Sequence, residues 1–99
     1  PHNKNYKIWR GILKIIKRNG EEAIFDINKI IVAITKANNE VPIAERLSTE
    51  QINNIAENIS KLCEESKVEM NVEAIQDLVE KGIMKEGAFS IAKIYITYR

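Results

Sequence analysis

The sequence has 99 residues, of which 44% are hydrophobic and 29% are charged, a composition typical of one globular domain and not of a disordered chain. A single cysteine, Cys63, and a single histidine, His2, exclude a disulfide framework and a Cys/His zinc site. No apolar run is long enough to span a membrane, no signal peptide is recognisable, and the lone thiol suits a reducing compartment, so we expect a cytoplasmic protein without a membrane partner.

The charges are balanced overall but unevenly distributed along the chain. Residues 1–39 contain eight Lys or Arg against three Asp or Glu, whereas residues 40–99 contain seven against eleven. This basic N-terminal third favours a local anion site over a nucleic-acid-binding face, because duplex-binding proteins usually spread Lys and Arg over a whole surface. A solvated charged face without any ligand would give the same composition.

The chain begins with a mostly polar and basic stretch, residues 1–11, which we expect to be an N-terminal extension of a domain covering residues 12–99. The domain starts with two β-prone runs separated by Asn19 and Gly20, a pair typical of hairpin turns. A two-residue turn would mix apolar and charged residues on both faces of the hairpin. We therefore favour a three-residue turn with a left-handed Gly20 in a bulge, which pairs Lys17 with Glu21.

In this register one face of the hairpin is apolar, with Lys17 at its end. That inner face carries Leu13, Ile15, Ala23 and Phe25.

Four amphipathic helices are predicted after the hairpin. Asp26 can cap the first, which runs to about residue 38. Ser48 and Gln51 form a capping box for the second, and Asn71 can cap the third. Gly87 separates the third helix from the fourth. The inward positions, at helical spacing, are Ile27, Ile30, Ile31 and Ile34; Ile52, Ile55, Ala56, Ile59, Leu62 and Cys63; Val72, Ile75, Leu78, Val79 and Ile83; and Ile91, Ala92, Ile94, Tyr95 and Tyr98.

Two short segments complete the prediction. Residues 39–47, which include Pro42, are expected to be a connection, and residues 68–70 a short edge strand. The predicted fold class is α+β: a four-helix bundle capped by a small antiparallel hairpin or three-stranded lid.

No residue pattern indicates catalysis or metal binding, because nucleophile–histidine pairs, metal-ligand motifs and Gly-rich phosphate loops are all absent from the sequence. One cluster does indicate binding. Lys17 and Arg18 precede the hairpin turn and Lys29 lies in the first turn of the following helix, which is a favourable place for a polyphosphate. Ile15 and Ile30 could supply aliphatic walls for a purine ring. A hairpin tip kept soluble by its charges is the alternative.

Three segments of the sequence resemble the ATP-cone family. Its opening signature reads roughly V-x-K-R-[DN]-G-x-x-x-x-F-[DN]-x-x-K-I, and residues 14–30 read KIIKRNGEEAIFDINKI. VEAIQDLVEKGIM (residues 72–84) is similar to the third-helix motif of the family, and AKIYITYR (residues 92–99) to its closing helix. The resemblance covers about residues 12–99, and the three motifs occur in the family's order.

The resemblance implies an allosteric regulatory domain of a ribonucleotide reductase large subunit. Bound ATP, with Mg²⁺, would permit turnover of that oxidoreductase and dATP would stop it, through changed subunit association and without catalysis in this domain. The implied partners are an adenine nucleotide, the remainder of the large subunit, its small subunit and a nucleotide-dependent oligomer. The alternatives are an ATP-cone of a nucleotide-responsive transcriptional regulator and a plain helical interaction module.

The site residues of the family carry over as follows. The positions that contact the phosphates are Lys17, Arg18 and Lys29. The positions around the base and ribose are Ile15, Asp26, Ile30, Val72, Ile75 and Gln76. One family feature departs: a glutamate position on the second strand is occupied by Ala23, with Glu21 or Glu22 as nearby substitutes. A family cation just beyond the closing helix would fall after Arg99, outside this sequence, unless Arg99 substitutes for it.

Overall fold

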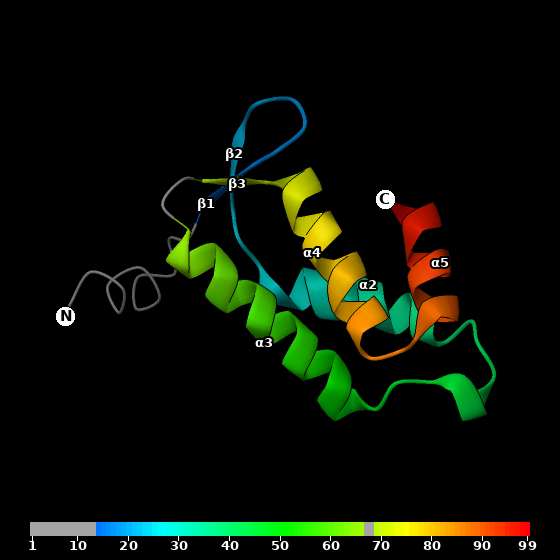
Figure 1. Ribbon diagram of the computed structural model, residues 1–99. Coiled ribbons are helices and arrows are strands. Elements are labelled where there is room, and N and C mark those ends of the chain that lie inside the picture. The colour runs from blue at the N-terminus through cyan, green and yellow to red at the C-terminus, as the bar shows by residue number, and fades with distance from the viewer. Residues whose placement is uncertain (1–13, 67–68) are drawn as a thin grey trace.

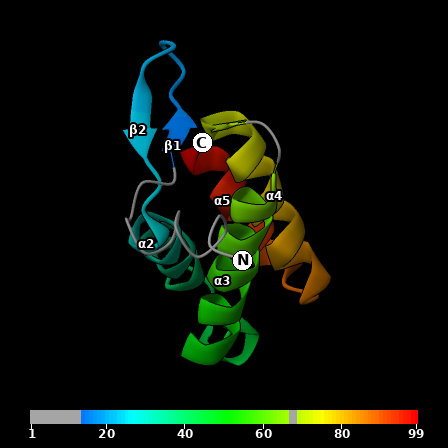
Figure 2. The same ribbon diagram turned by 90° about the vertical axis from the view of Figure 1, so that its left-hand side faces the viewer.

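The computed structural model describes residues 14–66 and 69–99. Within them the order of elements is β1 (Lys14–Ile16), β2 (Glu22–Ile24), α2 (Ile27–Asn38), the 3-10 turn η1 (Ile43–Glu45), α3 (Thr49–Glu65), β3 (Met70–Asn71), α4 (Val72–Lys85) and α5 (Phe89–Tyr98) (Figure 1). The predicted α+β architecture is confirmed. The small sheet lies at one end of the helices, and the β1–β2 turn projects beyond them (Figure 2). The expected extension, residues 1–11, lies outside the described residues, as do Leu13 and Val68.

The hairpin adopts the bulged three-residue turn that the apolar pattern favours. Ile15 pairs with Ala23, and the backbone N–H of Lys17 donates to the carbonyl of Glu21 at 2.7 Å. Gly20 has a φ of +87°, in the left-handed region that a residue with a Cβ adopts only at a cost. The predicted register is therefore confirmed.

Three helices, α2, α3 and α4, begin directly after a residue whose side chain accepts from one of their first backbone N–H groups. Asp26 accepts from the N–H of Asn28 at 3.0 Å, and Asn71 accepts from the N–H of Ala74 at 2.7 Å. At the start of α3, Ser48 and Gln51 form the predicted capping box, with reciprocal bonds of 3.1 Å and 2.8 Å. These caps fix the points at which the chain enters α2, α3 and α4.

The third strand joins the hairpin to the helices. β3 pairs with β1 in parallel, with Ile15 opposite Met70 and Ile16 opposite Asn71, so the strand order is β2-β1-β3. Because Asn71 is also the cap of α4, the sheet places the first turn of α4 directly beside β1. A short edge strand was expected at residues 68–70; the structure has one at Met70–Asn71, and Val68 lies outside the described residues.

The core lies between the four helices. α2 packs against α3 and α5, and α4 packs against the same two helices, so each helix has two neighbours. α3 and α4 pack closely at Gly82, where an added Cβ would lie 2.8 Å from Cγ2 of Ile55. The buried hydrophobic residues are Ile30, Ile34, Ala37, Val41, Leu47, Ile52, Ile55, Ala56, Ile59, Cys63, Ile75, Val79, Ile83, Ile91, Ala92 and Tyr95.

Two inward assignments, Leu62 and Tyr98, were wrong or incomplete. Leu62 is 50% exposed, because Cys63 takes the inward position on that turn of α3. Tyr98 lies at the surface, where the ammonium group of Lys36 sits 4.9 Å from its ring centre.

The expected connection, residues 39–47, is more ordered than its sequence indicates. It contains η1 and buries Val41 and Leu47. The buried side chain of Asn38 accepts from the backbone N–H of Leu47 at 2.8 Å and donates to its carbonyl at 3.1 Å. Asn38 therefore ties this segment to the end of α2.

None of the helices in the described part of the chain has both the length and the apolar character that a membrane crossing requires.

Candidate functional site

A cavity of about 370 Å³ lies where the sheet meets the bundle. Its volume is within the range of small-molecule binding sites. Residues from β1, β2, α2, α4 and α5 line it, together with the link between β2 and α2. The lining residues are Ile15, Lys17, Ala23, Ile24, Phe25, Asp26, Lys29, Ile30, Val72, Ile75, Gln76, Val79 and Tyr95.

Two lysines from different elements line this cavity. Lys17 directly follows β1, and Lys29 lies in the first turn of α2. Lys17 lies 4.0 Å from the carboxylate of Glu21, an exposed contact that screens its charge only weakly. Among the described residues, Lys29 has no ion-pair partner. Lys17 and Lys29 therefore line one cavity between the lid and the bundle.

The start of α2 is electrostatically unusual. Its first turn contains Lys29 and no acidic residue, although the positive end of a helix dipole ordinarily favours acidic side chains. Asp26 compensates in part, because its carboxylate accepts from the N–H of Asn28. Positive charge at a helix N-terminus is a local conflict, and an anion beside Lys29 would relieve it.

The remaining wall of the cavity is mainly apolar. Ile15 is half-buried on the inner face of the hairpin, and Ile30 and Ile75 are buried on α2 and α4. Val72 and Gln76 lie on the same side of α4 and also contact the cavity. Eight of the nine expected site residues therefore line one cavity: Ile15, Lys17, Asp26, Lys29, Ile30, Val72, Ile75 and Gln76.

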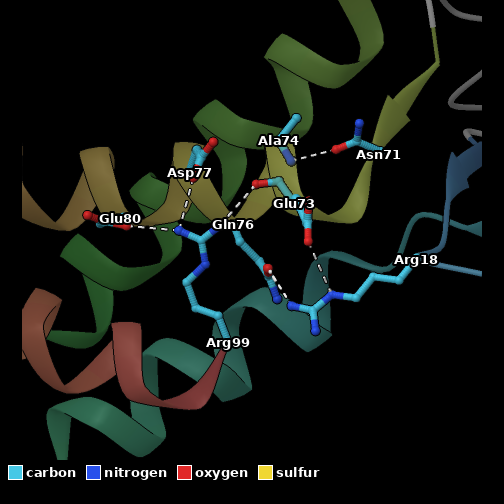
Figure 3. A network of polar contacts seen from close by, with 8 residues as sticks. All are labelled: Arg18, Asn71, Glu73, Ala74, Gln76, Asp77, Glu80 and Arg99. Atoms are coloured by element: carbon cyan, nitrogen blue, oxygen red, sulfur yellow. Dashed lines mark hydrogen bonds and ion pairs between the residues drawn. The ribbon is translucent and has the colours of Figure 1, made fainter.

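Arg18 is the expected residue that does not line this cavity. It borders a second hollow of about 340 Å³ together with Ile16, Lys17, Gly20, Asn71, Val72 and Glu73. Figure 3 shows its guanidinium group reaching across to α4. There its Nη2 atom donates to Oε1 of Gln76 at 3.3 Å, and its Nε atom lies 3.7 Å from the carboxylate of Glu73. Lys17 lines both hollows, so the two are adjacent.

Arg99 is bound to the outer face of α4 and not to the cavity. Its Nη1 atom lies 2.9 Å from both Asp77 and Glu80, and its Nη2 atom donates to the carbonyl of Glu73 at 3.4 Å (Figure 3). The hydrogen bond to Asp77 raises the pKa of the guanidinium group, with further support from Glu80. Arg99 therefore joins α5 to α4, and it is not an unpaired substitute for the family cation.

The departure at Ala23 changes one wall of the cavity. Ala23 lines the cavity with a methyl group where some ATP-cones carry a glutamate. Glu22 pairs instead with Lys14 at 3.3 Å, and Glu21 with Asn19 at the tip of the hairpin. Neither glutamate lines the cavity, so neither takes the place of the missing carboxylate.

Several other lining residues were not predicted as site residues from the sequence. Ile24 points away from the inner face of the hairpin by strand alternation and is 62% exposed, yet it lines the cavity at its junction with α2. Phe25 was assigned to the inner face of the hairpin, and Val79 to the inward face of the third predicted helix. Tyr95 was assigned to the core and is buried, and its position on the cavity follows only from how α5 packs between α2 and α4. Burial raises the pKa of its hydroxyl, which therefore stays protonated at neutral pH.

Cys63 is not part of this site. It is buried in α3, and burial raises the pKa of its thiol. A protonated, buried thiol is a poor nucleophile, which agrees with its assignment to the core.

The fold and the cavity define a small binding module, in which a hairpin lid and the starts of two helices surround one site. The chain belongs to the ATP-cone family: the sequence model described as the ATP cone domain matches residues 13–99.

The chain is similar to ribonucleoside-diphosphate reductase subunits and to an anaerobic ribonucleoside-triphosphate reductase. The ribonucleoside-diphosphate reductase subunit alpha of Chlamydia trachomatis is 33% identical over 101 residues, covering 94% of this chain and 10% of that protein. The ribonucleoside-diphosphate reductase subunit alpha of Treponema pallidum is 38% identical, covering 88% of this chain and 11% of that protein. The anaerobic ribonucleoside-triphosphate reductase of Haemophilus influenzae is 34% identical, covering 86% of this chain and 12% of that protein. The chain thus spans about a tenth of the length of these curated relatives.

Proposed function

We propose that this chain binds an adenine nucleotide, ATP or dATP, in the cavity and acts as a regulatory domain of a ribonucleotide reductase. The observation that carries the proposal is the shared cavity of Lys17 and Lys29, two cations from separate elements beside an apolar wall. Membership of the ATP-cone family and the similarity to reductase subunits support it. In this proposal the domain itself performs no catalysis, and the host enzyme is a cytoplasmic oxidoreductase.

The proposed pose follows the division of the cavity into charged and apolar parts. The phosphates lie against Lys17 and Lys29 at the charged end of the cavity, next to the second hollow that Lys17 also lines. The purine packs between Ile15, Ile30 and Ile75, because these aliphatic side chains bury the apolar faces of the ring.

The sugar and the metal ion complete the pose. Val72, Gln76 and Asp26 border the ribose and the edge of the base. Mg²⁺ would arrive bound to the phosphates, and Asp26 is the single carboxylate among the described lining residues. One oxygen of Asp26 already accepts from Asn28, which leaves the other for the ion or for the ligand.

The regulatory part of the proposal requires two states of a larger assembly. ATP and dATP differ by one hydroxyl group, so the two ligands can have opposite effects only if they stabilise different arrangements of the domain. The partners in this proposal are the remainder of the large subunit, the small subunit and a nucleotide-dependent oligomer. The host reductase is active with ATP on the domain and inactive with dATP.

A titration of this chain with Mg-ATP, Mg-dATP and Mg-GTP tests the binding. A ligand at about 100 times its dissociation constant stabilises the protein by about 2.7 kcal/mol, which a thermal-shift or calorimetric measurement detects readily. We expect stabilisation by both adenine nucleotides and a smaller effect of GTP. If no adenine nucleotide changes the melting temperature, the chain is a helical interaction module instead.

A further inference from the structure

The side chain of Gln76 is held from outside the cavity that it lines. Its Oε1 atom accepts from Nη2 of Arg18 at 3.3 Å, across the gap between the hairpin turn and α4 (Figure 3). The two residues are 58 positions apart in the sequence, so this contact exists only when the sheet is docked on the bundle. Among the described residues, the Nε2 atom of Gln76 has no hydrogen-bond partner.

The chemistry of the guanidinium group fixes which end of the Gln76 amide faces it. Arginine carries five N–H donors and no acceptor, so it can contact the amide oxygen but not the amide NH₂ group. With the oxygen bound to Arg18, the NH₂ group is the polar end of Gln76 that is left for the cavity. Without Arg18, the amide could rotate and present either end.

Arg18 is itself held in place by Glu73. Its Nε atom lies 3.7 Å from the carboxylate of Glu73, one turn before Gln76 on the same helix. The planar guanidinium fork can contact Glu73 and Gln76 at the same time. The compact ammonium group of a lysine lacks this fork of fixed donors. The nearby carboxylate also offsets the charge of Arg18, whereas Lys29 has no such partner among the described residues.

We propose that Arg18 is a positioning residue for Gln76, so that the cavity presents a hydrogen-bond donor to an acceptor atom of the nucleoside. The acceptor is a ring nitrogen of the purine or an oxygen of the sugar. This inference rests on the proposed function. It assigns Arg18 an effect on the nucleoside part of the ligand, whereas the family resemblance implies an effect on the phosphates alone.

A double-mutant cycle on ATP affinity tests the coupling between the two residues. We expect Arg18→Ala and Gln76→Ala each to weaken ATP binding about 5- to 10-fold, the effect of losing one hydrogen bond. The double variant should then bind about as well as either single variant, because both remove the same oriented donor. If the two effects instead multiply, Arg18 and Gln76 act independently and the inference is overturned.

Arg18→Lys and a phosphate-free ligand separate positioning from phosphate contact. Arg18→Lys retains the charge but loses the fork, so we expect a loss of ATP affinity similar to that of Arg18→Ala. Arg18→Ala should weaken the binding of adenosine, measured by NMR titration, by the same factor as the binding of ATP. Lys29→Ala is the matched control. It should weaken the binding of ATP and leave the binding of adenosine unchanged.

The outcomes distinguish this inference from the proposed function. Full ATP affinity in Arg18→Lys, or an unchanged adenosine affinity in Arg18→Ala, would leave Arg18 as a phosphate contact and overturn the positioning role. Failure of the unaltered chain to bind either ATP or adenosine would overturn the proposed function itself. Because Arg18 is exposed and Gln76 only half-buried, none of these variants should change the helical circular dichroism signal.

Discussion

The sheet and the helical bundle differ sharply in how much of their surface is buried. Every α-helix contributes residues to the core, and Ile34, Ile83 and Ile91 have no measurable exposure. In the three strands no residue is buried, and Ile24 is 62% exposed. The bundle therefore supplies most of the folding stability, whereas the sheet is a lid with apolar surface still available to a ligand.

This difference explains why the cavity lies at the boundary of the two regions. A site within the bundle would require a void in the close-packed core, at a cost in stability. A site on the lid alone would have a wall on one side only. At the boundary, the rigid helices α2 and α4 fix one wall, and the hairpin with Lys17 provides the other.

The largest expected effect comes from a matched pair of isoleucines. Ile59→Ala, in the bundle, removes a side chain that is 2% exposed and should lower the free energy of unfolding by about 2–5 kcal/mol. Ile24→Ala, in the lid, should change it by about 0.5 kcal/mol or less. Urea denaturation of both variants measures the difference. Equal destabilisation would show that the lid carries as much stability as the bundle.

The next largest effect is on binding and not on stability. Lys17→Ala and Lys29→Ala should each weaken ATP binding by about 1.5–3 kcal/mol, because a charge-assisted contact to the phosphates is lost. Both side chains are exposed, so the melting temperature without nucleotide should be unchanged. Isothermal calorimetry and a thermal melt of each variant provide the two readouts. Unaltered affinity in both variants would contradict the proposed site.

A smaller effect tests how tightly the bundle is packed. Gly82→Ala adds a methyl group 2.8 Å from Cγ2 of Ile55, and the strain should outweigh the gain in helix propensity for a net cost of about 1 kcal/mol. In an Ile55→Ala background the space is available, and the same substitution should become neutral or stabilising. Denaturation curves of the four proteins in this cycle measure the coupling. Additive effects would mean that the two helices can move apart freely.

The smallest effect is expected on the surface of the lid. Glu22→Gln removes the ion pair with Lys14, in which both side chains are about half exposed. Such pairs contribute about 0–1 kcal/mol, and salt screens them further. We expect no measurable change of melting temperature in 0.5 M NaCl. A clear loss of stability at that salt concentration would show that the lid depends on its surface charges.

Much of the fold could be predicted because local signals and packing signals agree. The hairpin register followed from the need for one apolar face, and Asp26, Ser48 and Asn71 were recognisable as caps from their residue types. The parallel pairing of β1 with β3 was not predicted, since it depends on how the helices between them return the chain. Leu62 was misassigned because helical spacing alone cannot choose between adjacent positions on a broad apolar stripe.

The candidate site could be predicted in its charged part and less well in its geometry. Lys17, Arg18 and Lys29 were recognisable as a basic cluster, and Lys17 and Lys29 do share the cavity. That Arg18 reaches Glu73 and Gln76 could not be anticipated, because the contact joins side chains whose separation depends on how the lid docks on α4. Tyr95 was recognised as a core residue, but a helical stripe does not indicate which core residues border a void.

The parallel pairing of β1 with β3 has a consequence for the order in which the molecule assembles. The β1–β2 hairpin closes a loop of only a few residues, but Ile15 and Met70 are joined by a chain that contains α2 and α3. Closing so long a loop costs entropy that the few contacts of a two-residue strand cannot repay alone. We therefore expect the nucleus of folding to form among the helices, and the sheet to be completed only after α4 has been positioned.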